Sequence, residues 1–236
     1  MIAAYDLILL PGMGADARMF EPQQRTYPGL QVPAWLSPER RESLAHFAGR
    51  MAETVKFRRP LVLGGASLGG MIAWEMARHL RPEALILISS CSTRSGIRRL
   101  FRAGQPLAPF IPAGFIKLAK LMAPFHSGRI GWSGAQHRGL AAAMFRDADT
   151  AFLKWALAAV LDWRPSAMEG TPVYRIHGAR DLVIPARLVT ADVVVPRGHL
   201  INLSHAEEVN RFIGQVIEKA MAGWSEGGES RRHNSE

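Results

Sequence analysis

Short apolar runs alternate along the chain with longer stretches in which apolar residues recur every three or four positions. The runs predict strands at 5–10, 30–33, 60–64, 84–89, 173–177 and 192–195. Helical spacing fills 43–57 and 68–80, and a capping-box pattern from Ser204 to Glu207 predicts the start of a last helix. Parallel strands joined by crossover helices produce this alternation, so the sequence predicts an α/β fold.

The strand pattern is interrupted between 92 and 164, where prolines separate segments of helical spacing. We therefore expect a helical cap insertion over 92–164 between two parts of one core, 1–91 and 165–223. Such an insertion would lie above the carboxyl edge of the sheet, where open α/β sheets bind ligands. Residues 224–236 are polar and lack core-forming side chains, which predicts a flexible tail.

Length and composition are those of a globular protein with one large domain. The chain has 236 residues, of which 48% are hydrophobic and 21% charged. A single cysteine, Cys91, excludes an internal disulfide and a Cys/His zinc cluster, and favours a reducing compartment. No signal-peptide pattern or apolar stretch of about 18 residues is present. We therefore predict a cytoplasmic protein without a transmembrane segment.

Positive charge is concentrated in the middle of the chain. The formal net charge is +9, and residues 84–146 contain no Asp or Glu. The cations of this stretch are Arg94, Arg98, Arg99, Arg102, Lys117, Lys120, Arg129, Arg138 and Arg146. A basic surface can attract nucleic acid, an anionic membrane or an acidic protein, or have no specific partner. No nucleic-acid recognition motif accompanies the charge, so we expect no nucleic-acid binding.

The strongest chemical signal is the segment Gly65-Ala66-Ser67-Leu68-Gly69, which matches Gly-x-Ser-x-Gly. It follows a predicted buried strand and begins a predicted helix, which is the setting that a nucleophilic serine on a tight turn requires. Small neighbours allow the strand and helix to approach closely, and the helix N-terminus favours developing negative charge. The alternative is a glycine-rich packing turn with an incidental serine.

These residues resemble the α/β-hydrolase family, and the resemblance covers nearly all of the chain except the tail. It implies a mostly parallel, doubly wound sheet with a helical cap insertion. The segment Pro11-Gly12-Met13 after the first strand is similar to the family's oxyanion loop, which usually reads His-Gly where this chain has Pro11-Gly12. The resemblance implies that the backbone N–H groups of Met13 and Leu68 bind the tetrahedral oxyanion.

Two later segments follow the family's order. Residues 177–181 resemble the acid loop, with Asp181 as the acid, and residues 197–200 resemble the segment that presents His199 as the base. The resemblance implies a Ser67, Asp181 and His199 triad in which His199 takes the serine proton and Asp181 orients the imidazole. Neither a cofactor nor a metal is needed for this chemistry.

Each assignment has a rival residue. His205 and His177 are alternatives to His199 as the base, although a helix start and a strand end explain them better. Asp162 is an alternative acid if the acid follows an earlier strand. Cys91 lies after a predicted strand near the expected site, and a small buried apolar role explains it best.

The resulting hypothesis is a serine hydrolase that cleaves a small carboxylic ester or thioester through a Ser67 acyl-enzyme. An acidic acyl carrier or an anionic thioester is a possible partner of the basic cap. The alternatives are an acyltransferase, another serine-histidine reaction of the same fold (C–C hydrolysis, a lyase or a perhydrolase reaction), and a non-catalytic ligand-binding protein. The acyl chain, the leaving group and the oligomeric state do not follow from the sequence.

Overall fold

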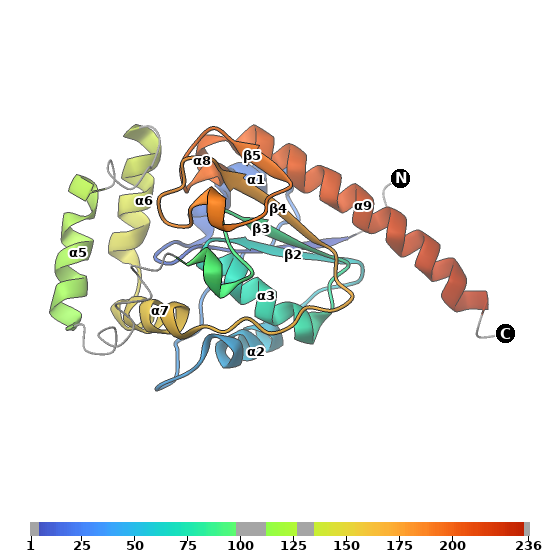
Figure 1. The fold of residues 1–236 in the computed structure, drawn as a ribbon, viewed down its shortest axis with the longest axis horizontal. Coiled ribbons are helices and arrows are strands. Elements are labelled where there is room, and N and C mark those ends of the chain that lie inside the picture. Colours follow the sequence, from blue (N-terminus) through green and yellow to red (C-terminus); the bar gives the residue numbers. More distant parts are fainter. Residues whose placement is uncertain (1–4, 98–111, 127–134, 234–236) are drawn as a thin grey trace.

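The computed structural model describes residues 5–97, 112–126 and 135–233, and its centre is one parallel sheet (Figure 1). The strands are β1 (Asp6–Leu10), β2 (Leu61–Ala66), β3 (Ala84–Ile88), β4 (Val173–Gly178) and β5 (Val193–Val195). Their spatial order follows the chain, and each neighbouring pair is parallel. The carboxyl ends of all five strands therefore lie along one edge of the sheet, as the predicted α/β fold requires.

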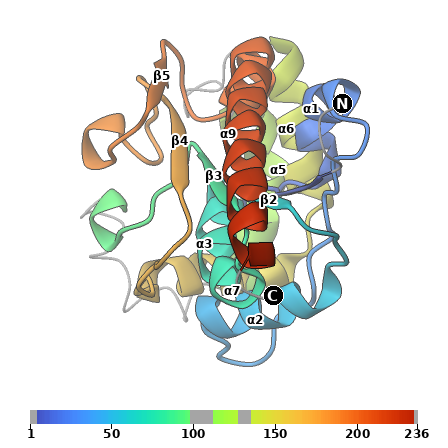
Figure 2. The same cartoon turned by 90° about the vertical axis from the view of Figure 1, so that its right-hand side faces the viewer.

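Alternating side chains of the strands divide the core into two layers. Leu7 and Leu9 of β1 belong to one cluster, whereas Ile8 and Leu10 belong to the other, as the two-residue period of a strand dictates. Helices α2 (Leu44–Thr54) and α3 (Leu68–Leu80) cover one face. Helices α8 (Ile201–Ser204) and α9 (Ala206–His233) cover the other, which Figure 2 shows with α9 crossing the sheet, and α1 (Glu21–Thr26) packs against these two helices. The doubly wound arrangement is confirmed.

Two predicted helices form where the apolar spacing places them. Helix α3 spans the predicted residues, and α2 begins after Ser43, whose side-chain oxygen accepts a hydrogen bond from the backbone N–H of His46. This N-cap satisfies one of the unpaired donors of the first helical turn. Helix α2 ends at Thr54, three residues before the predicted end, because Val55 has extended backbone angles.

The strand predicted at 30–33 does not form. Gln31 alone bridges to Ile8, through two backbone hydrogen bonds with Leu7 and Leu9. The chain cannot extend this bridge into a ladder in the usual way, because Pro33 has no backbone N–H to donate. The apolar run is therefore the outer bridge of the sheet rather than a sixth strand.

The start of the last helix was also predicted wrongly. Ser204 ends the short helix α8, and α9 begins at Ala206 after His205, so the expected capping box is not made. The backbone N–H groups of Ser204 and His205 instead donate to the carbonyl oxygens of Leu200 and Ile201. Helix α9 continues to His233, through ten residues of the predicted tail, and projects beyond the sheet (Figure 1).

In the described parts of the chain between β3 and β4, three cap helices are present. They are α5 (Ala113–His126), α6 (Ala135–Asp147) and α7 (Thr150–Asp162), grouped at the end of the molecule opposite the free end of α9 (Figure 1). Phe152 and Trp155 of α7 pack against Phe47 of α2, with ring centroids 6.0 and 4.3 Å apart. The Trp155 indole N–H also donates to the carbonyl oxygen of Glu42 at 2.8 Å. The cap arginines at 98, 99, 102 and 129 lie outside the described residues.

Within the described parts of the chain, no helix combines the length and apolar character that crossing a bilayer requires.

Alanine substitutions at two glycines should change the stability of the fold in opposite directions. A Cβ at Gly64 in the central strand would lie 2.6 Å from the Ile86 carbonyl oxygen, whereas Gly139 of α6 has open space around it. We expect Gly64→Ala to lower the free energy of unfolding by about 1–3 kcal/mol, because backbone cannot yield. Gly139→Ala should raise it by about 0.5–1 kcal/mol through helix propensity. Urea unfolding measures both, and equal effects would contradict this packing.

Candidate active site

Ser67 occupies a strained turn between β2 and α3. Its backbone angles are φ 52° and ψ −119°, which non-glycine residues rarely adopt. A Cβ at Gly65 would clash with the backbone of Gly69, so the turn can close only because position 65 has no side chain. The serine N–H donates to the Ile88 carbonyl oxygen at 3.0 Å. The turn therefore holds Ser67, which is partly exposed, at the carboxyl edge of the sheet.

The loop after β1 packs directly against this turn. A Cβ at Gly69 would clash with the carbonyl oxygens of Leu10 and Pro11, and a Cβ at Gly12 would lie 3.6 Å from Ser67 Cβ. Within the described residues, the backbone N–H groups of Met13 and Leu68 donate to no protein acceptor. Two unpaired amide donors therefore lie on the two segments that meet at Ser67.

Asp181 and His199 lie together beyond the ends of β4 and β5. Asp181 Oδ2 is 2.7 Å from His199 Nδ1, and the two residues are 3% and 8% exposed. Because the carboxylate accepts, the proton is on Nδ1 and the other ring nitrogen is free to act as a base. The two loops approach closely because Gly178 has no side chain, since a Cβ there would clash with the Gly198 carbonyl oxygen.

The Asp181 carboxylate is ionised although it is buried. Burial alone would raise the pKa of Asp181, but hydrogen bonding from His177 and His199 holds it well below its usual range. Asp181 Oδ1 accepts from the backbone N–H groups of Val183 and Ile184 at 2.8 and 2.9 Å. Donors on both oxygens therefore keep a negative charge fixed beside His199.

Ser67 lies on the same sheet edge as this pair, but the structure makes no hydrogen bond between the Ser67 hydroxyl and His199 within the described residues. Ser67 follows β2, whereas Asp181 and His199 follow β4 and β5. Nucleophile and base are often separated or misaligned in unliganded enzymes and come together when substrate binds.

Three of the rival residues fit the chemistry less well. His205 contacts the Ser204 hydroxyl at 3.3 Å and makes no contact with Asp181, and Asp162 ends helix α7. Burial raises the pKa of Cys91 to about 12, so its thiol stays protonated and is a poor nucleophile.

Two residues that support the site were not singled out for that role from the sequence. Buried Ser90, just after β3, donates from its hydroxyl to the Ser67 carbonyl oxygen at 2.7 Å, and Gly70 has no side chain to obstruct it. His177, which the sequence offers only as an alternative base, contacts Asp181 instead. The signal for Ser90 was a polar pair directly after a buried strand, which is unusual in a parallel sheet.

A cavity of about 220 Å³ separates the loop after β1 from the cap. Most of its surface is apolar and comes from residues such as Trp35, Met144 and Phe152, although Asp16, Asp147 and Asp149 also line it. A second cavity, of about 1050 Å³, lies near the amino ends of the strands and is lined by residues such as Pro82, Pro172 and Trp224. Among the residues that line the two cavities, neither set includes a site residue predicted from the sequence.

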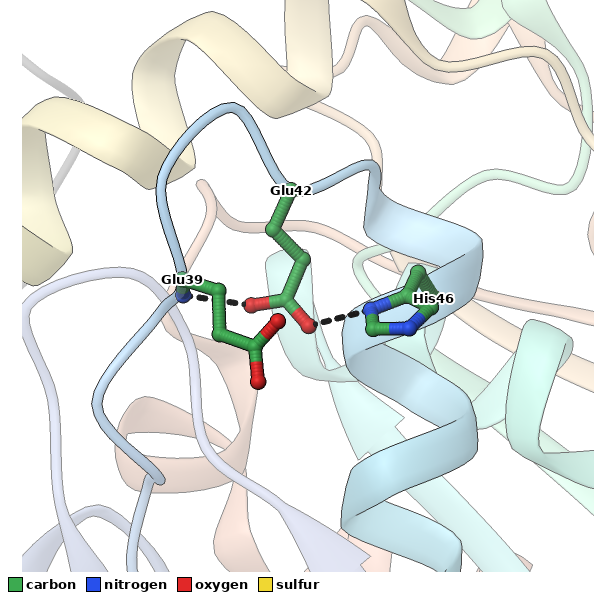
Figure 3. Close-up of side chains that lie close together, drawn as sticks. All are labelled: Glu39, Glu42 and His46. Carbon is green, nitrogen blue, oxygen red and sulfur yellow. Dashed lines mark hydrogen bonds and ion pairs between the residues drawn. The ribbon is translucent and has the colours of Figure 1, made fainter.

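A cluster with metal-ligand chemistry lies outside this site (Figure 3). Glu39, Glu42 and His46 each offer a ligand atom, all within 4.8 Å of one another. Arg50 already donates to both oxygens of the buried Glu42 carboxylate, at 3.1 and 3.0 Å. A metal would have to displace this guanidinium, so the cluster is better explained as an anchor for the loop before α2.

Comparison with known proteins identifies the family. The profile of the alpha/beta hydrolase family matches residues 3–212. The chain belongs to the alpha/beta hydrolase family. A search of curated proteins gives no match. Among solved structures, the hydrolase resembles a thermophilic esterase from Thermogutta terrifontis, with 18% identity, a TM-score of 0.68, and 92% of this chain and 91% of the esterase covered.

Two further structures show the same fold. The enol-lactonase from Burkholderia xenovorans LB400 has 16% identity and a TM-score of 0.67, with 92% of each chain covered. YbtT, the type II thioesterase of the yersiniabactin biosynthetic pathway, has 20% identity and a TM-score of 0.61, with 92% of this chain and 94% of YbtT covered. At identities of 20% or less, these three structures show that this chain shares their fold and nothing further.

Protonation of Asp181 should lower the free energy of unfolding. Its folded-state pKa is lowered, so the ionised carboxylate stabilises the native state above the unfolded value of about 3.9. This contribution is lost as the pH falls from there through the folded-state pKa. We expect Asp181→Asn to lower the free energy of unfolding by about 2–4 kcal/mol at pH 7. The difference in free energy of unfolding between the wild type and Asp181→Asn should become smaller as the pH falls below about 4. Urea unfolding at pH 7, 5, 4 and 3 measures it, and a constant deficit would contradict the assignment.

Proposed function

We propose that Ser67, His199 and Asp181 form a catalytic triad and that the protein hydrolyses a carboxylic ester or thioester through a Ser67 acyl-enzyme. The observation that carries this proposal is the buried 2.7 Å hydrogen bond between Asp181 and His199, at the same sheet edge as the strained Ser67 turn. A buried, ionised carboxylate beside an imidazole stabilises the imidazolium that general-base catalysis generates. Membership of the alpha/beta hydrolase family supports the same chemistry.

In this mechanism the Ser67 hydroxyl oxygen attacks the carbonyl carbon while His199 Nε2 takes its proton. The former carbonyl oxygen becomes an oxyanion, and the free N–H groups of Met13 and Leu68 donate to it. As the tetrahedral intermediate collapses, His199 returns the proton to the departing alcohol or thiol. Water, activated by the same histidine, then attacks the acyl-enzyme and releases the acid and free Ser67.

The cap provides the proposed binding pocket for the substrate. We place a short acyl or alkyl group in the 220 Å³ cavity, because its surface is largely apolar and its walls include Gly14, which follows the proposed oxyanion donor Met13 in the chain. Residues 92–164 would then act as the specificity-determining cap on a core made of 1–91 and 165–223. The solved relatives include an esterase, a lactonase and a thioesterase, which supports an acyl substrate.

Kinetics of single and double variants test the triad. We expect Ser67→Ala and His199→Ala each to lower kcat for a short aryl ester by about 10³-fold or more. The double variant should be scarcely slower than either single one, because the two residues act as a unit. His205→Ala is the matched control and should keep near-normal activity. Full retention of activity in Ser67→Ala would refute the proposed mechanism.

Covalent labelling tests the nucleophile without knowledge of the substrate. A fluorophosphonate probe should add one adduct to the folded protein, and peptide mapping should place it on Ser67. Ser67→Ala should remain unmodified, and His199→Ala should react much more slowly because the hydroxyl is no longer activated. An adduct at another serine, or none under native conditions, would refute the assignment.

A further inference from the structure

His177 is buried and its ring contacts the proposed acid. It lies on β4, is 1% exposed, and its Nε2 is 2.7 Å from the Ile184 carbonyl oxygen and 3.3 Å from Asp181 Oδ2. Both neighbours can only accept, because the carbonyl has no proton and the carboxylate is ionised. The Nε2 atom of His177 must therefore carry a hydrogen, which makes this ring a donor rather than a base.

His177 is linked to both oxygens of the Asp181 carboxylate, indirectly through Ile184 and directly by a close contact. The ring N–H donates mainly to the Ile184 carbonyl oxygen, and the Ile184 N–H donates to Asp181 Oδ1. The longer contact places the same N–H beside Asp181 Oδ2, the oxygen that His199 also uses. Removing the His177 N–H would therefore release the Ile184 peptide and take away the N–H group that lies beside Asp181 Oδ2.

We infer that His177 is a positioning residue of the hydrolase, which fixes the orientation of Asp181 and shares its negative charge with His199. This inference rests on the proposed triad. It differs from a packing role, because the polar N–H group of His177 lies beside the carboxylate oxygen that accepts from His199.

Few of the described ionisable groups surround Asp181, so the influence of His177 on its carboxylate can be measured separately. Within the described residues, its ionisable contacts are His177 from β4 and His199 from the loop after β5. Arg180 and Arg197, on the two flanking loops, are exposed and make no ion pair with it. Loss of the His177 donor should concentrate the carboxylate charge on His199, stabilise the imidazolium, and move its titration to higher pH.

The experiment compares His177→Leu, which removes the donor, with His177→Gln, whose side-chain amide can donate from a similar position. We expect His177→Leu to lower kcat about 10- to 100-fold with little change in KM. The acid limb of kcat/KM should move up by about half a pH unit or more. His177→Gln should restore most of the rate and the original pH midpoint. Thermal unfolding of both variants shows whether they are folded.

An NMR titration of the His199 ring in the resting protein gives a second readout that needs no substrate. The titration of His199 should move to higher pH in His177→Leu and return in His177→Gln. If His177→Leu is folded and neither midpoint moves, or if His177→Gln fails to restore it, the inference is wrong. An inactive wild-type protein that still shows the NMR shift would instead refute the proposed function alone. If His177→Leu does not fold, the His177→Gln and wild-type comparison decides, with unequal midpoints contradicting the inference.

Discussion

The site depends on a contact between backbone segments that no side chain could enter. At Gly65 and Gly69 a Cβ would overlap the backbone of the turn itself or the carbonyl oxygens of Leu10 and Pro11. The missing side chains let β2, α3 and the loop after β1 meet around Ser67. Contacts between main-chain segments therefore determine where the proposed oxyanion donors, the Met13 and Leu68 amides, lie.

A second close approach organises the other half of the site. Gly178 lets the loops after β4 and β5 pack together, and the backbone N–H of Arg180 donates to the Arg197 carbonyl oxygen at 2.8 Å. Asp181 and His199 therefore meet, although they lie 18 positions apart in the sequence. The strand between them, β5, has only three residues. The short connection suffices because backbone hydrogen bonds, rather than a long crossover helix, hold the two loops in register.

The sequence predicted those features that depend on local pattern. Buried strands and the amphipathic helix α3 follow from periodicity, and the Ser67 turn follows from glycine spacing. It failed at 30–33, where pairing with β1 was limited by Pro33, and at Ser204, where a separate turn of helix uses the capping residue. The support that Ser90 gives to Ser67 was missed because it depends on a contact between residues 23 positions apart. Distances of that kind arise from tertiary packing, which one sequence does not encode in any local motif.

The cap helices differ in their relation to the 220 Å³ cavity that we propose for the substrate. Helix α6 brings Phe145 against Gly14, where a Cβ would clash with the ring, and α7 stacks its Phe152 on Trp35 at 5.2 Å. Both helices also contribute walls to the 220 Å³ cavity. Among its described side chains, helix α5 contributes none of those walls, and its Phe115 is 63% exposed. Changes in α6 and α7 therefore act on the shape of this cavity directly, whereas the described part of α5 reaches it through its packing on those two helices.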